Sequence, residues 1–208
     1  EKFLLIMTEK GTVKKSKFKD FDSNYKSLQA IKLKDDDKVV SVKTTSGKED
    51  VILVSQKGQA IRFDETNLKA QGRSAMGVRG IKLREGDKVV GAATSRDETL
   101  LFITAKGYGK RTSLEDYRLQ SRGGKGIICI KTTDRNGPVV GSSQVSLKDE
   151  VMLVSNQGKL IRTQVQGISA LGRITQGVRV MNMTPGEKVV ALERIAETSD
   201  DESNGASE

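Results

Sequence analysis

The sequence predicts an all-β protein, built as a propeller-like array of about four blades with four strands in each blade. One observation is a repeated turn: Lys-Gly pairs stand at 10–11, 57–58 and 106–107, and Gln157-Gly158 follows at the same spacing. Another is a Val-Val pair that recurs every 50 residues, at 39–40, 89–90, 139–140 and 189–190. A period of this length is typical of propellers and solenoids. No segment before the C-terminal tail shows a sustained helical period.

The third repeat shows the order of the elements within one blade. T-L-L-F-I-T (99–104) predicts a first strand, Lys106-Gly107 a tight turn, and Y-G-K-R-T-S-L (108–114) a second strand. A longer loop over 115–125 leads to G-I-I-C-I-K (126–131), and a turn at D-R-N-G (134–137) precedes V-V-G-S-S-Q (139–144). Four strands in about 50 residues correspond to one propeller blade.

The same order divides the whole chain. We expect blades at 3–49, 50–98, 99–150 and 151–197, within a β-domain of residues 1–195. Residues 198–208 are acidic and have no apolar anchor, so we expect a disordered tail. Because the chain begins at Glu1, directly on a strand-like segment and without Met, we expect a fragment or a processed piece.

The charge balance points to a polyanionic partner. The 208 residues contain 36 Lys and Arg against 27 Asp and Glu, a formal net charge of +9. Nucleic acid is the first candidate and an anionic membrane surface the second. With no Trp, five Phe and three Tyr, a surface that stacks on single-stranded bases is disfavoured. No apolar run reaches the ~18 residues of a membrane span, so we expect a soluble, cytoplasmic protein that does not enter a membrane.

Independent catalysis is disfavoured, and we expect no cofactor and no metal. The chain has no His, which removes the commonest general base and zinc ligand. Cys129, the only thiol, is expected to be a buried apolar side chain in a reducing compartment. Asp35, Asp36 and Asp37 occupy a slot that is a turn in the other repeats, and Tyr108 is interpreted as an exposed turn residue. K-G-Y-G-K-R-T (106–112) does not fit a phosphate-binding P-loop.

One cation recurs at the same position of the second strand in every blade. The four residues are Lys15, Arg62, Arg111 and Arg162. Equivalent positions in successive blades would place these side chains in a curved row that could follow a phosphate backbone. The alternative is an outer face that is solvated or paired in salt bridges.

A glycine-rich loop distinguishes the third repeat from its neighbours. Residues 120–126 read Q-S-R-G-G-K-G, where the sister copies read Q-G-R-S-A-M-G (71–77) and L-G-R-I-T-Q-G (171–177). The blade itself does not need Gly123 and Gly124. They would let the backbone, with Arg122 and Lys125, approach a phosphate closely. The alternative is a loop that is merely flexible.

Q-S-R-G-G-K-G resembles the gyrase A box, the signature Q-[RK]-R-G-G-[RK]-G of the carboxy-terminal domain of the DNA gyrase A subunit. The phrases K-G-Y-G-K-R-T and G-R-x-x-x-G-V-R are also similar to that domain, and the resemblance covers all four repeats. It implies a β-pinwheel, usually of six blades, that binds duplex DNA around its rim and wraps it in a positive sense. Ser121 replaces the expected cation, and the copy lies in the third of four repeats, so we expect a secondary box in the last four blades.

The resemblance further implies a role in ATP-dependent negative supercoiling. The partners that it implies are the gyrase B subunit, together with the rest of the gyrase A subunit. The nucleophilic tyrosine, the metal carboxylates and the ATP site of gyrase lie elsewhere, so no catalytic residue is assigned here. The predicted DNA-binding residues combine the box with the cations of the repeats. They are Gln120, Arg122, Gly123, Gly124, Lys125, Gly126, Lys15, Arg62, Arg73, Lys110, Arg111, Arg162 and Arg173.

Two other functions stay open at this point. The equivalent domain of the topoisomerase IV A subunit usually has a degraded or absent box and would select DNA crossings. A propeller that docks proteins would expose aromatic side chains on its docking face, and we expect no such face in a chain with no Trp, five Phe and three Tyr. We expect a monomer with weak sequence preference, and the repeats alone leave open whether four blades close or form an arc.

Overall fold

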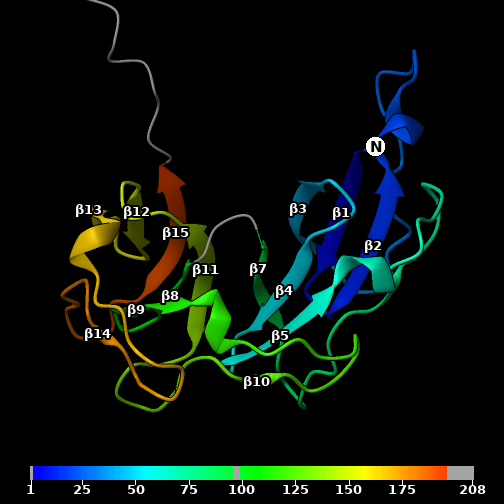
Figure 1. Ribbon diagram of the computed structural model, residues 1–208. Coiled ribbons are helices and arrows are strands. Elements are labelled where there is room, and N and C mark those ends of the chain that lie inside the picture. The colour runs from blue at the N-terminus through cyan, green and yellow to red at the C-terminus, as the bar shows by residue number, and fades with distance from the viewer. Residues whose placement is uncertain (1, 96–98, 196–208) are drawn as a thin grey trace, which may run out of the picture.

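The computed structural model describes residues 2–95 and 99–195 and consists of four antiparallel sheets that follow one another in a curved row (Figure 1). The first sheet has the order β3-β1-β2-β6, formed by Val39–Thr45, Phe3–Thr8, Thr12–Lys17 and Val78–Arg79. The second has the order β10-β5-β4-β7, formed by Ile127–Ile128, Gln59–Asp64, Asp50–Ser55 and Val89–Thr94. The third has the order β11-β8-β9-β14, formed by Val139–Val145, Thr99–Thr104, Tyr108–Ser113 and Val178–Arg179. The fourth has the order β13-β12-β15, formed by Leu160–Gln164, Glu150–Ser155 and Val189–Ile195.

The all-β prediction and the four-blade array are confirmed. In the described part of the chain, helical turns are limited to four short 3-10 segments, one after the second strand of each repeat. They are η1 (Phe18–Phe21), η2 (Glu65–Asn67), η3 (Leu114–Asp116) and η4 (Val165–Gly167). None is long and apolar enough to cross a membrane. The acidic tail that we expect at 198–208 lies outside the described residues.

Each hydrophobic core lies between two neighbouring blades. Strand β8 is a continuous apolar run because both of its faces are covered: Leu100 and Phe102 pack toward blade two, whereas Leu101 and Ile103 pack toward blade four. A third cluster joins blades one and two. Successive side chains of a strand point to opposite faces, so the central strands of the two middle blades, β4 and β8, each contribute to two cores. The blades therefore stabilise one another in series.

Glycine closes the hairpin between the first and second strands for two physical reasons. At Gly107, φ is +78°, a left-handed conformation that only glycine adopts without strain. A Cβ there would also lie 2.1 Å from the Met181 carbonyl oxygen. Gly58 repeats both features, with φ +77° and a Cβ position 2.2 Å from the Ile130 carbonyl oxygen. This position of the turn therefore has no room for a side chain, because a segment of the next repeat packs against it.

That crossing segment corrects one sequence prediction, because the fourth strand of a blade does not come from its own repeat. Residues 68–83, 117–132 and 168–183, called here arms two, three and four, each reach back to the preceding blade. The short strand in each arm pairs with that blade's second strand: β6 with β2, β10 with β5, and β14 with β9. A buried apolar residue anchors the start of each arm, namely Leu68, Tyr117 and Ile168.

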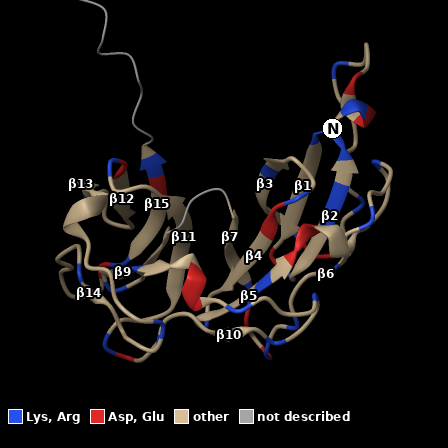
Figure 2. Ribbon diagram, in the orientation of Figure 1, with Lys and Arg blue, Asp and Glu red and all other residues tan. Residues whose placement is uncertain are grey.

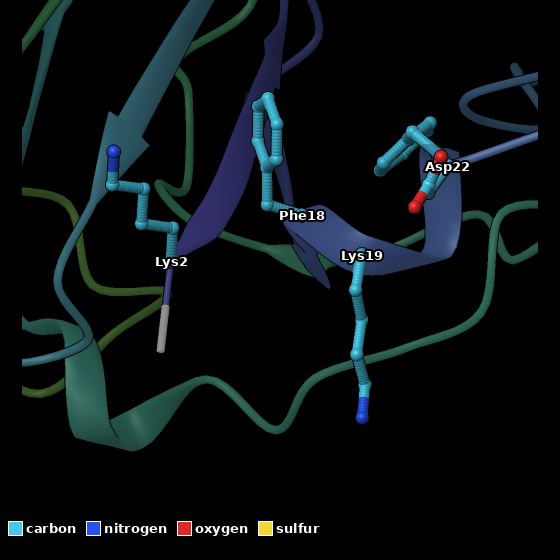
Figure 3. A pocket seen from close by; sticks show the side chains of 5 residues that line it. Lys2, Phe18, Lys19 and Asp22 are labelled. Atoms are coloured by element: carbon cyan, nitrogen blue, oxygen red, sulfur yellow. The ribbon is translucent and has the colours of Figure 1, made fainter.

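The two ends of the row lack this exchange within the described residues. In repeat one, Phe18 is 48 % exposed, and with Phe21 it lines an open pocket that also contains Lys2, Lys19 and Asp22 (Figure 3). In blade four, β13 has no fourth strand beside it in the described region, and Leu160 is 56 % exposed. The inner strands β3, β7, β11 and β15 lie in that order along a groove of about 440 Å³.

The predicted turn at Asp35–Asp37 is confirmed. Asp36 has φ +61°, and one carboxylate oxygen of Asp37 accepts hydrogen bonds from the backbone N–H groups of Lys10 and Lys38 at 2.9 and 2.8 Å. The aspartates therefore hold the hairpin turn in place. The described residues contain no group of three or more potential metal ligands.

Candidate nucleic-acid interface

The arms lie side by side and form a continuous band along the outer edge of the blades. The Lys82 N–H donates to the Gly124 carbonyl at 2.8 Å, which joins arm two to arm three. The Lys131 N–H donates to the Thr175 carbonyl at 2.9 Å, which joins arm three to arm four in the same way. The loop 120–126 belongs to arm three, so it lies on the edge of blade two although repeat three supplies it.

The band carries positive charge only. The three arms contain Lys or Arg but neither Asp nor Glu. The cations are Lys69, Arg73, Arg79, Lys82, Arg118, Arg122, Lys125, Lys131, Arg173 and Arg179. All are exposed except Arg73, Arg122 and Arg173, which are half-buried. Figure 2 shows β14, β10 and β6 following one another along the lower side of the row. A surface of this kind attracts a polyanion that follows the row of blades.

The glycine-rich loop has a backbone conformation that its sister copies do not share. Gly123 has φ +83°, whereas the residues at that position in the sister copies, Ser74 and Ile174, have no positive φ. Its N–H points to the neighbouring arm and donates to the Gly80 carbonyl at 2.8 Å. Gly126 has φ +73°, and a Cβ there would lie 2.5 Å from the Ala60 carbonyl oxygen. Gly123 therefore sets the course of the loop, and Gly126 lets it pack on blade two.

The two cations of the loop have different environments. Arg122 is half-buried, and its Nη1 donates to the Arg79 carbonyl oxygen at 2.5 Å, which ties the loop to arm two. Arg173 in the next arm does the same to the Ile128 carbonyl at 2.8 Å. Lys125 is exposed and is Met76 or Gln176 in the sister copies. Among the loop residues, Lys125 is therefore the cation best placed to meet a phosphate, while Arg122 also positions the loop.

The predicted row of cations on the second strands requires a correction. Lys15 is only 6 % exposed, and its ammonium lies 3.1 Å from a carboxylate oxygen of the buried Glu65. Arg62 pairs with Asp50 at 2.6 Å and donates to the carbonyls of Leu114 and Tyr117.

The other two cations of the predicted row are Arg111 and Arg162. Arg111 donates to the Ile168 carbonyl at 2.6 Å. Arg162 pairs with Glu150 and keeps 62 % of its side chain exposed. Lys15 is bound to Glu65 in η2, whereas Arg62 and Arg111 are bound to the first residues of arms three and four, so the primary contacts of all three cations are structural. Arg162 is exposed because its blade has no such arm within the described residues.

Lys110 is wrong as a predicted phosphate contact, because it is completely buried. Its ammonium donates to the carbonyls of Gly172 and Arg173, each at 2.7 Å, and to the Thr175 hydroxyl at 3.2 Å. Burial lowers its pKa to about 8. It holds the loop 171–177 from beneath.

Two other interpretations can be compared with the structure. Cys129 is fully buried, as predicted, and burial raises the pKa of its thiol to about 12, which leaves it unreactive. Tyr108, expected to be exposed, is only 6 % exposed and is the first residue of β9. Its ring is covered by the guanidinium groups of Arg135 and Arg179.

Most exposed cations of the band were not predicted from the sequence. They are Lys69, Arg79, Lys82, Arg118, Lys131 and Arg179. The signal was present, because each segment from the anchor residue to the end of the third predicted strand contains Lys or Arg without any acid. The strand exchange that gathers these segments on one edge is what the repeat pattern alone does not show.

Blades that exchange strands, a curved row and a basic outer band define a class of propeller-like repeat domains. The chain belongs to the family described as DNA gyrase C-terminal domain, beta-propeller, whose model matches residues 2–46, 49–96, 98–146 and 149–196. A curated relative, the DNA gyrase A subunit of Escherichia coli (strain K12), is 44 % identical over 201 residues, which are 96 % of this chain and 23 % of the relative. The chain thus spans about a quarter of the length of that relative.

Solved structures agree with this assignment. The structure of a DNA gyrase A C-terminal domain matches with a TM-score of 0.84 and 30 % identity, over 94 % of this chain and 66 % of that one. The C-terminal domain of a DNA topoisomerase IV matches with a TM-score of 0.87 and 28 % identity, over 93 % of this chain and 62 % of that one.

Proposed function

We propose that the band formed by the arms binds duplex DNA without sequence preference, and that the curved row of blades wraps the duplex. The observation that carries this proposal is the charge of the arms, which contain ten Lys and Arg and no carboxylate. Their cations are spread over three successive blades, as a bent polyanion requires. Contacts of this kind read phosphate positions and groove shape, so deformability of the DNA should govern any preference.

The energy of bending explains why many contacts are needed. Bending a 20–30 base-pair segment through 40–90° costs on the order of 1–6 kcal/mol. No single loop offsets such a cost, whereas a band of cations adds one phosphate contact after another. In this arrangement the glycine-rich loop at 120–126 lets the backbone approach the DNA closely, and Lys125 contributes charge.

The chain acts as part of a gyrase A subunit, in a type II topoisomerase with the gyrase B subunit. There, wrapping in a positive sense would present a neighbouring duplex segment for strand passage and so direct ATP-dependent negative supercoiling in the bacterial cytoplasm. Cleavage and ATP hydrolysis would be carried out by other parts of the enzyme, and this chain needs no cofactor for its role.

Two measurements test the proposal. If about eight phosphates are neutralised, log K should fall against log salt with a slope near −7, and affinity should drop about 10⁴-fold between 50 and 200 mM salt. Relaxation of closed circular DNA by a separate topoisomerase, with and without the chain at low salt, tests the wrap. A flat salt dependence excludes phosphate-driven binding. An unchanged linking number at saturation excludes chiral wrapping but leaves binding intact.

The equivalent domain of topoisomerase IV remains a second candidate, because the two solved structures match almost equally well. The Q-S-R-G-G-K-G sequence at 120–126 favours gyrase, because it resembles the gyrase A box, which the equivalent domain of topoisomerase IV usually has in degraded form or lacks. The linking-number experiment separates the two, because a domain that only selects crossings changes no linking number.

A further inference from the structure

Two arginines converge on one buried tyrosine at the outer edge of blade three. Arg135 Nε donates to the Tyr108 hydroxyl oxygen at 3.3 Å, and Arg179 Nη2 donates to the same oxygen at 3.0 Å. Their guanidinium carbons lie 5.4 and 5.2 Å from the centre of the tyrosine ring, within the range of a cation–π interaction. Arg135 comes from the turn before β11, and Arg179 from the end of β14 in arm four.

This cluster has positive charge and unused donors. Within the described residues, neither guanidinium group has a carboxylate within ion-pair distance. A guanidinium has five N–H donors, and each arginine uses one of them on the tyrosine. The Tyr108 oxygen accepts both bonds, and its own hydrogen is donated to no acceptor in the described region. Two exposed guanidinium groups and one hydroxyl therefore offer donors to a ligand that supplies oxygen and negative charge.

Beside the cluster lie one positive and one negative charge, from Lys106 and Asp134. The ammonium of Lys106 is held against the backbone carbonyl of Asp134, next to Arg135 in the same turn. The Asp134 carboxylate is exposed and forms no ion pair in the described residues. The hydrogen bonds from Arg135 and Arg179 lower the pKa of Tyr108, and a more acidic hydroxyl is a better donor to an anion.

The cluster occurs in one repeat and replaces an acidic turn. The position of Arg135 is occupied by Asp35, Glu85 and Pro185 in the other repeats, at a spacing of 50 residues. In the register of the short strands, Arg179 lies opposite Tyr108, whereas the equivalent pairs are Arg79 with Thr12 and Ile128 with Gln59. The fold forms the same turn and strand pair without these side chains. Their presence together in one repeat therefore points to a ligand.

We propose that Arg135, Arg179 and the Tyr108 hydroxyl bind one phosphate of duplex DNA, as a fixed contact one blade beyond the glycine-rich loop. The proposal rests on the proposed function, since it places the duplex along the band of arms. Two planar guanidinium groups can each donate two parallel hydrogen bonds to the non-bridging oxygens of a phosphodiester. The tyrosine ring holds both in position before the DNA arrives, so little side-chain entropy is lost on binding.

The test measures binding of a fluorescently labelled 40-base-pair duplex to the full chain over a range of salt concentrations. R135Q/R179Q removes the contact with the one phosphate that the two cations share and should make the salt slope less negative by about 0.9, with at least a tenfold loss of affinity. K19Q/K48Q is the matched control, because it removes two exposed cations outside the arms, and should leave the slope unchanged. Y108F should keep the slope and weaken binding several-fold.

Three results separate the possible failures. If the wild type binds with a steep slope and R135Q/R179Q keeps that slope, the phosphate assignment is overturned while the proposed function stands. If the wild type shows no salt-dependent binding, both fail. Calorimetry with inorganic phosphate distinguishes the source of the ligand: saturable binding lost in R135Q/R179Q, with an unchanged DNA slope, assigns the cluster to free phosphate and overturns the proposal. Because R135K/R179K keeps the charge, it should retain the slope and lose affinity, which excludes unfolding as the cause.

Discussion

Replacing Gly124 by alanine tests whether the glycine-rich loop contacts DNA through its backbone. The fold gives no reason for glycine at this position. Gly124 has no positive φ, and a Cβ there would meet the Ser121 carbonyl oxygen at 3.5 Å and the Ile61 Cδ1 at 3.6 Å, which are ordinary contacts. A glycine that the fold tolerates as alanine points to close approach of a ligand.

Gly124→Ala is expected to increase the stability of the fold slightly. Gly→Ala at a compatible backbone conformation stabilises a protein by about 0.4–1 kcal/mol, because the unfolded chain loses freedom. The expected effect on binding is opposite. A hydrogen bond to a charged group contributes about 1.5–3 kcal/mol, so a Cβ that keeps one phosphate away should raise Kd by about 10- to 100-fold.

The measurements are thermal denaturation and duplex binding of the same preparations. Gly167→Ala is the matched control, because Gly167 has no positive φ, has no atom within 4 Å of its Cβ position and lies outside the arms. It should change neither Tm nor Kd beyond the small stabilisation. If Gly124→Ala binds the duplex as the wild type does, the backbone of the loop makes no close phosphate contact and the reasoning is refuted.

The two other glycines of the loop should respond differently. Gly123→Ala should cost about 1–2 kcal/mol of stability, because φ +83° is strained for any residue with a Cβ, while the Cβ itself would make only ordinary contacts with Arg79, the nearest at 3.6 Å. Gly126→Ala should cost more, since its Cβ would also lie 2.5 Å from the Ala60 carbonyl oxygen. An equal loss at all three positions would mean that flexibility, not geometry, explains the glycines.

Three further predictions use groups outside the loop. Arg62→Met should lower the free energy of unfolding by about 1–3 kcal/mol, because it removes charged hydrogen bonds, and should leave the salt slope unchanged. Arg118→Met, at an exposed position of arm three, should reduce the slope by about 0.9 without changing stability. Reversed results would contradict the roles assigned to these two arginines. Hydrogen bonds from Lys159, Ser155 and Thr184 lower the pKa of Glu187 from 4.5 to about 2. The contribution of this carboxylate to the stability of the fold is therefore complete above pH 4.5 and is lost as the pH falls toward 2. Glu187→Gln should therefore flatten that acid-side loss in urea titrations, and an unchanged pH profile would exclude this carboxylate as its cause. Cys129 should react with a thiol reagent only at the rate of unfolding, and rapid labelling of the native chain would show that it is accessible.

The sequence predicts the elements of each repeat well because their signals are local. Apolar runs such as 99–104 and left-handed glycines such as Gly107 depend only on neighbouring residues. The partner of β6 is different, because two residues at 78–79 have no periodicity and pair with a strand about 65 positions earlier. The exchange of strands was therefore not predicted, although the strands of a repeat were; the short 3-10 segments were not predicted either.

The local nature of the sequence signals also explains why the side-chain contacts of the candidate site were not predicted. The repeat pattern identifies Arg62 as one member of a recurring cation, but its partners, the carbonyls of Leu114 and Tyr117, lie in the next repeat. Periodicity shows that a side chain recurs, and it does not show what the side chain contacts. The loop at 120–126 was found because it departs from the repeat, and the conformation of Gly123 departs from its sister copies as well.

The specialisation of this loop extends to the strand beneath it. The loop at 71–77 is held from below by the buried Lys14, whose ammonium donates to the Arg73 carbonyl at 2.5 Å, and Lys110 holds the loop at 171–177. Burial lowers the pKa of both lysines, so each ammonium is buried at a cost that its carbonyl partners offset. Beneath Gly124, the equivalent residue is Ile61.

An isoleucine offers nothing to the carbonyls of the loop, so the loop is held differently. Its restraints come from the side, through the Gly123 N–H and the Arg122 guanidinium, both bound to arm two. Ile61→Lys should therefore restore the lysine support of the sister loops and weaken DNA binding even though it adds a positive charge. A gain in affinity would show that charge alone, and not the course of the backbone, determines what this loop contributes.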